Sequence, residues 1–107
     1  MKPNNCFIEK VTYWLKKNFG EFQIISDLFL IGSILDSNKN LINDVDVVQK
    51  LKSTEKNNLI ELGKQVKEIK KDFLKEFSLP LHITTFTDNE NIDFVIFMSK
   101  NEKIKVI

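Results

Sequence analysis

Two short apolar segments constrain this chain most: one ends in Gly32-Ser33, and the other begins at Asp44. An apolar run that reaches Ile31 and stops at a glycine is typical of a buried strand leading into a tight turn. Residues 44–47 alternate acidic and apolar side chains, so residues 44–49 predict a second strand with its carboxylates on one face. The chain must therefore fold around at least two strands, with polar chemistry at the end of one and the start of the other.

Those polar residues suggest a specific chemistry. Backbone N–H groups at a glycine turn can approach an anion closely, and the Ser33 hydroxyl adds a donor. Asp44 and Asp46 offer the oxygen ligands that Mg²⁺ prefers. The pattern predicts a site for a nucleoside triphosphate and a divalent metal ion. The alternative interpretation is an ordinary strand-ending turn followed by an edge strand with solvated carboxylates.

The same residues resemble the signature of the polymerase-beta-like nucleotidyltransferase superfamily. That signature is a hydrophobic residue, Gly, and Gly or Ser, followed after a gap by Asp, a hydrophobic residue, Asp or Glu, and another hydrophobic residue. Ile31-Gly32-Ser33 and Asp44-Val45-Asp46-Val47 match it, with ten residues between Ser33 and Asp44. In size the chain is most similar to the minimal nucleotidyltransferases, and the resemblance covers residues 7–87 and beyond.

The resemblance implies an activity: transfer of AMP from Mg²⁺-ATP to a hydroxyl on a protein, an RNA end or a small molecule. Gly32 and Ser33 would bind the terminal phosphates, and Asp44 and Asp46 would be catalytic metal ligands. Minimal nucleotidyltransferases often pair with a small helical HEPN-domain toxin that they silence by adenylylation. The resemblance therefore also implies a toxin-antitoxin role with such a protein partner.

The third strand departs from the family pattern. The superfamily usually places a third acidic residue on a later strand, and here residues 81–84 offer His82, with Thr84 next on the same face. Imidazole suits Zn²⁺ or Mn²⁺ better than Mg²⁺, so His82 cannot simply replace an aspartate. It could act as a general base, since imidazole exchanges protons near neutral pH. A hydrogen-bonded packing residue is the alternative.

A catalytically degenerate member of the superfamily is a second hypothesis, in which the chain works as a nucleotide-binding or protein-interaction subunit. The missing third acid favours it. The apolar run at residues 92–98 is too wide for one helix face, which suggests burial against a partner or a second copy of the chain. Burial of this helix within the monomer is equally open.

The element order predicts an α/β (α+β) fold with one small mixed sheet packed against helices. We expect a helix through Phe19, a strand segment with an irregularity at Ser26-Asp27, and a helical turn over 33–37. We then expect a strand over 44–49, a helix from a Ser53 or Thr54 cap to residue 77, and a strand over 81–86. A capping box over 87–90 introduces a last helix to residue 99, and residues 104–107 form an edge strand or a tail.

Composition limits the partners. The 107 residues predict a single domain over 1–107, and the net charge of +1 does not indicate a long nucleic-acid partner. Lysines on the long helix alternate with acids, which predicts a solvated face. The one cysteine, Cys6, excludes an intramolecular disulfide and predicts a small core residue. No transmembrane or signal-peptide pattern is present in the sequence, so we expect a cytoplasmic protein.

Overall fold

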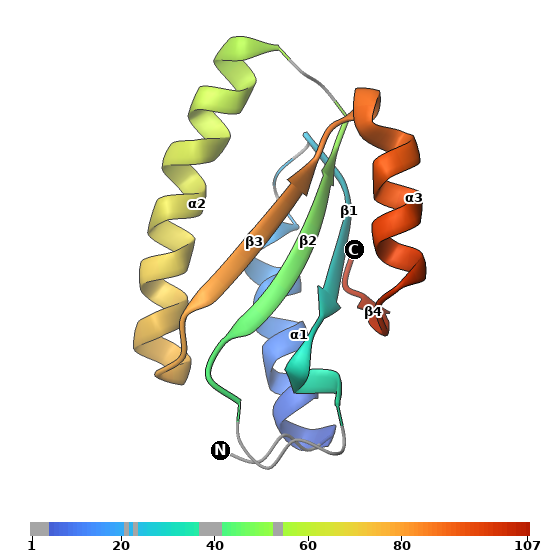
Figure 1. Ribbon diagram of the computed structural model, residues 1–107. Helices are drawn as coiled ribbons and strands as arrows, with labels where there is room; N and C mark the ends of the chain where they lie inside the picture. The colour runs from blue at the N-terminus through green and yellow to red at the C-terminus, as the bar shows by residue number, and fades with distance from the viewer. Residues whose placement is uncertain (1–4, 21, 23, 37–41, 53–54) are drawn as a thin grey trace.

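The computed structural model describes residues 5–20, 22, 24–36, 42–52 and 55–107 (Figure 1). Within these residues the chain forms three helices and one four-stranded mixed sheet, in strand order β3-β2-β1-β4. The elements are α1 (Asn5–Phe19), β1 (Ile25–Ile31), β2 (Val45–Leu51), α2 (Lys56–Phe77), β3 (Leu81–Phe86), α3 (Asn91–Ser99) and β4 (Lys103–Lys105), with short 3₁₀ turns at Ser33–Leu35 and Asp88–Glu90. The predicted α+β class with a small mixed sheet is confirmed.

The sheet carries helices on both faces (Figure 1). The larger core cluster joins α1 and α2 to one face, where β2 contributes Val45 and Val47. The smaller cluster joins α3 to the other face, where β2 contributes Val48. Because side chains alternate along a strand, Asp46 shares the face of Val48 and α3. Asp46 therefore lies on the opposite side of the sheet from the larger core.

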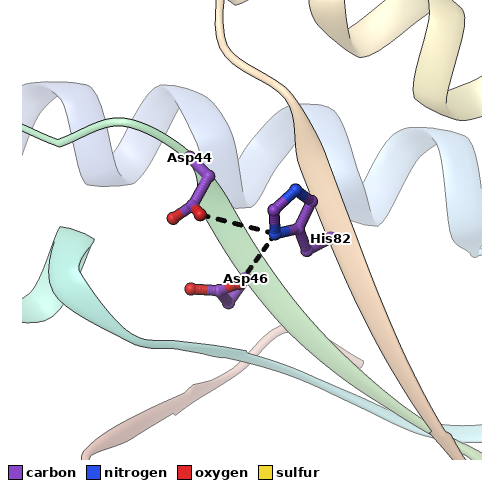
Figure 2. A group of neighbouring side chains, drawn as sticks. All are labelled: Asp44, Asp46 and His82. Carbon is purple, nitrogen blue, oxygen red and sulfur yellow. Dashed lines mark ion pairs between the residues drawn. The ribbon is translucent and has the colours of Figure 1, made fainter.

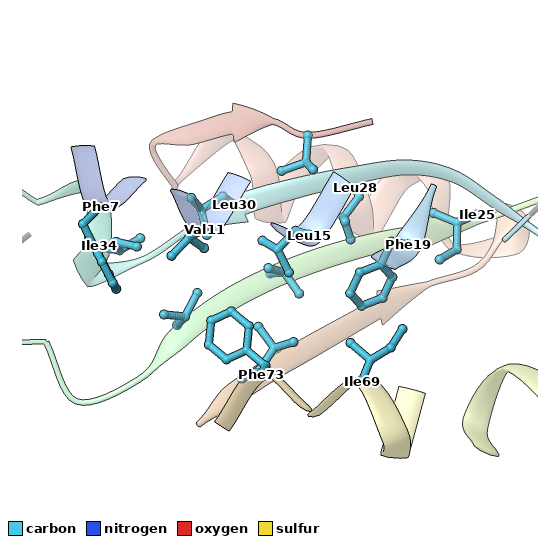
Figure 3. Packing of buried hydrophobic residues seen from close by; sticks show 14 of the residues in the cluster. Phe7, Val11, Leu15, Phe19, Ile25, Leu28, Leu30, Ile34, Ile69 and Phe73 are labelled. Atoms are coloured by element: carbon cyan, nitrogen blue, oxygen red, sulfur yellow. The ribbon is translucent and has the colours of Figure 1, made fainter. Parts of the chain in front are cut away.

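The two long helices form because each presents one apolar stripe to the sheet. Phe7, Val11, Leu15 and Phe19 recur at helical spacing in α1 and are all buried (Figure 3). In α2 the fully buried Phe73 packs edge-to-face against Trp14 of α1, with 5.3 Å between the ring centroids. This contact fixes α1 beside α2, and the half-buried Trp14 belongs to the core, as predicted.

Some local expectations were wrong or need refinement. Cys6 is exposed, because it lies one residue before the buried stripe that begins at Phe7. Strand β2 begins at Val45, so Asp44 directly precedes it. The irregularity near Ser26-Asp27 is a register shift within β1. The N-cap of α2 is Glu55, so the predicted cap at Ser53 or Thr54 is wrong by one or two residues. The end of the helical turn at residue 37 lies outside the described residues.

The C-terminal elements occur in the predicted order, with the last strand over residues 103–105 in place of 104–107. The backbone N–H of Thr87 donates to Glu90 Oε1 at 3.0 Å, which completes the capping box before α3. Residues 103–105 form the edge strand β4 beside β1. Among the described helices, none combines the length and apolar character needed to cross a membrane.

Candidate functional site

Strand register brings the polar residues together at one end of the sheet. Ile31, the last residue of β1, pairs with Asp46 of β2, and Asp46 pairs with His82 of β3. Strands β2 and β3 are parallel, so a crossover must join them, and α2 supplies it. Residues far apart in sequence therefore lie side by side across three strands.

Asp44, Asp46 and His82 form a compact triad (Figure 2). Nδ1 of His82 lies 3.4 Å from Asp44 Oδ2 and 3.6 Å from Asp46 Oδ1, and one ligand atom from each residue lies within 4.8 Å of the others. The His82 side chain is 58% exposed, while those of the aspartates are 32% and 33% exposed. The triad is therefore accessible to a ligand, and the exposure of His82 favours a site role over the interpretation as a packing residue.

The electrostatics of the triad favour a bound cation. Partial burial raises the pKa of Asp46, and the negative charge of Asp44 raises it further. The neighbouring His82 opposes this and lowers the pKa, whereas a hydrogen bond with Asp44 again raises it. Two carboxylates so close together resist simultaneous ionisation, and a cation between them would relieve their repulsion.

Gly32 is required by the geometry of this site. Its φ of 88° lies in the region that side chains rarely adopt, and a Cβ built on it would lie 2.6 Å from Asp46 Oδ2. The turn after β1 therefore contacts the carboxylate directly. The absent side chain leaves room for the Asp46 carboxylate, whereas phosphate binding at this turn stays a prediction.

A groove of about 450 Å³ begins at this turn. One of its lining residues is a lysine, Lys100, that the sequence analysis did not identify as a candidate. The groove is lined by Gly32, Ser33, Asp36, Lys100, Asn101 and Glu102. Lys100 follows α3, and the pairing of β4 with β1 brings this part of the chain beside the Gly32 turn. No local pattern signals such a distant contact, so only the strand order could have identified Lys100.

The triad offers two carboxylate oxygens and one imidazole nitrogen, and it could form a metal-binding site. The oxygen pair fits Mg²⁺, which commonly binds one or two carboxylates together with substrate phosphates. Inclusion of the His82 nitrogen would fit Mn²⁺ or Zn²⁺ better. Two other residues near the third strand, Thr84 and Glu90, are not part of the triad. Thr84 is exposed farther along β3, and Glu90 belongs to the capping box.

Comparison of the chain with family models, with curated proteins and with solved structures gives no match in any of the three.

Proposed function

We propose that this protein is a polymerase-beta-like nucleotidyltransferase that transfers AMP from Mg²⁺-ATP to a hydroxyl acceptor. The observation that carries the proposal is the register Ile31, Asp46, His82 across β1, β2 and β3. It joins the Gly32-Ser33 turn, the carboxylate pair and the third-strand residue at one end of the sheet, in the order that the motif implies. A chance match of the motif would not require these elements to meet.

The donor nucleotide would bind in the groove at Gly32 and Ser33. Ser33 supplies a hydroxyl donor, and Lys100 supplies a positive charge for the terminal phosphates. Asp36 and Glu102 line the same groove, so the divalent cation must supply most of the positive charge that the triphosphate needs. Asp44 and Asp46 would hold Mg²⁺, which would neutralise phosphate charge and stabilise the displacement at the α-phosphorus. The mixed donor set makes Mn²⁺ a second candidate for the same position.

His82 is placed to act as the general base. Its Nδ1 faces both aspartates, and its other ring nitrogen points away from them (Figure 2). The acceptor oxygen would form a bond to the α-phosphorus, the bond from that phosphorus to the bridging oxygen would break, and pyrophosphate would leave. The hydroxyl proton would pass to the outward nitrogen of His82, and the two carboxylates would stabilise the resulting imidazolium.

A specific observation favours a second candidate function, a nucleotide-binding or protein-interaction subunit without transferase activity. His82 stands where the family pattern has a carboxylate, so the metal site has one acidic ligand fewer. Helix α3 also leaves Ile92, Val95 and Ile96 exposed, which offers an apolar surface to a protein partner such as a HEPN-domain toxin, or to a second copy. We include pairing with such a toxin in both candidate functions, the active transferase and the subunit without transferase activity.

Calorimetry of Mg²⁺-ATP binding tests the site shared by both candidates. We expect the wild-type protein to bind, and Asp44→Asn with Asp46→Asn to abolish binding while the circular dichroism spectrum is unchanged. Equal affinity in the double variant would contradict the carboxylate site.

Transfer of label from α-labelled ATP then separates the candidates. The transferase predicts labelled acceptor in extracts with wild-type protein, and loss of transfer in His82→Ala with Mg²⁺-ATP affinity retained. Binding without any transfer would instead support the degenerate subunit.

A further inference from the structure

A second groove, of about 440 Å³, lies on the other side of the triad. It runs between α2 and the start of β3, and Lys67, Lys70, Lys71 and His82 line it together with the apolar Leu74, Pro80 and Leu81. Its size falls in the range of small-molecule sites. We call it the lysine groove. His82 belongs both to the triad and to this groove, because its Nδ1 faces the carboxylates while its side chain lines the groove wall.

The lysine groove has a surplus of positive charge. Within the described residues, no ion pair or hydrogen bond holds the ammonium groups of Lys67 or Lys70. Lys71 pairs with Glu68 at 4.0 Å, and both side chains of that pair are more than two thirds exposed, so the interaction is weak. Three cations and one loosely paired carboxylate would attract an anion of two negative charges.

The two grooves flank the carboxylates on opposite sides. The groove of Gly32 and Lys100 lies at the end of β1, and the lysine groove lies along β3, while Asp46 stands on β2 between them. In an in-line displacement the attacking oxygen approaches opposite the leaving pyrophosphate. If the triphosphate occupies the β1 side, as the proposed function requires, the acceptor must approach from the β3 side.

We propose that the lysine groove binds a phosphate monoester carried by the acceptor, so that the protein modifies a small phosphorylated molecule at a nearby hydroxyl. This inference rests on the proposed function for its assignment to the acceptor. A long nucleic acid fits less well, because Glu61, Glu68, Asp72 and Glu76 alternate with the lysines along α2 and the net charge of the chain is only +1.

Amide NMR titration of the full chain with glycerol 3-phosphate, with Mg²⁺ and α,β-methylene-ATP present, tests this assignment. Glycerol serves as the probe that lacks the phosphate. We expect glycerol 3-phosphate, and not glycerol, to shift the signals of residues 67–71 and 80–82. Lys67→Gln, Lys70→Gln and Lys71→Gln together should weaken binding about tenfold, by loss of three surface charges.

A matched variant removes the same charge from α2 outside the groove: Lys56→Gln, Lys64→Gln and Lys75→Gln should bind as the wild type does. Equal binding in the groove variant, or competition between glycerol 3-phosphate and the nucleotide analogue, would overturn the acceptor groove. Binding of an oligothymidylate at these lysines in place of glycerol 3-phosphate would also overturn it, in favour of nucleic acid. Failure of the analogue itself to bind contradicts the proposed function, and the acceptor role falls with it.

Discussion

Gly32 and the Asp46 carboxylate are in close contact at the end of the sheet. The glycine has φ of 88°, and its missing side chain leaves space for the Asp46 carboxylate, which a Cβ would approach to 2.6 Å. Gly32→Ala should therefore lower the free energy of unfolding by about 1–3 kcal/mol, through backbone strain and displacement of Asp46. It should also weaken Mg²⁺-ATP binding, and urea denaturation with calorimetry measures both effects.

Gly63 provides the control, since it lies within α2 and a Cβ there would meet nothing within 4 Å. Gly63→Ala should raise the free energy of unfolding by about 0.5–1 kcal/mol, because alanine loses less backbone entropy in a helix. A Gly32→Ala variant as stable as Gly63→Ala would contradict the described contact between the turn and Asp46.

The raised pKa of Asp46 predicts how stability depends on pH. Burial and the charge of Asp44 make ionised Asp46 less favourable in the folded chain than in the unfolded chain. The folded state then binds the proton more tightly, so this carboxyl destabilises the fold as pH rises through the folded pKa. Below the ordinary aspartate pKa of 3.8 the penalty disappears.

Asp46→Asn should therefore stabilise the protein at pH 7 more than at pH 3. Urea denaturation of both proteins at each pH measures the difference. A variant that is relatively more stable at pH 3 would show that the ionised Asp46 is favourable in the fold.

The residues of the triad could be predicted from the sequence because local patterns mark them. Asp44 and Asp46 are two positions apart, and His82 lies in a short apolar strand. The neighbouring Gly32 is marked by the apolar run that it ends. Lys100 and the lysine groove could not be predicted, because their roles depend on which strands are neighbours. The charge pattern of α2 predicted only a solvated face, since it contains no information about the groove that β3 forms beside it.

The apolar residues of α3 lie on two different faces of the helix, which the sequence alone could not distinguish. Phe94, Phe97 and Met98 pack against the sheet, whereas Ile92, Val95 and Ile96 remain exposed. The run of apolar residues had no helical periodicity, so it left burial in the monomer and contact with a partner equally open. In the structure, three of these apolar residues pack in the smaller core cluster, and the other three are exposed on the surface.

This division predicts that substitutions on the two faces of α3 change the free energy of unfolding by very different amounts. Met98→Ala should lower the free energy of unfolding by about 2–3 kcal/mol, because it leaves a cavity between α3 and the sheet. Val95→Lys with Ile96→Lys should change it by less than about 0.5 kcal/mol per site in the monomer.

Urea denaturation measures these changes, and light scattering shows whether the lysine variant changes the association state. Equal destabilisation by both changes, without a change in association, would contradict the exposed position of Val95 and Ile96.

At the scale of the whole molecule, the sheet order places the carboxylate pair between two grooves. β1 leads into the Gly32 turn, the crossover helix α2 contributes the lysines, and β3 contributes His82. The pairing of β4 with β1 brings Lys100 beside this turn. The sequence predicted the elements and the mixed sheet. It could not predict the strand order, because no local pattern specifies which edge β3 and β4 occupy.

The most direct test of the proposed nucleotidyltransferase site is a crystal structure with Mn²⁺ and α,β-methylene-ATP, with the metal located by anomalous scattering. We predict a metal peak between Asp44 and Asp46, with the triphosphate lying against Gly32, Ser33 and Lys100. Absence of metal from the carboxylates, or a triphosphate bound away from the Gly32 turn, would contradict the proposed site.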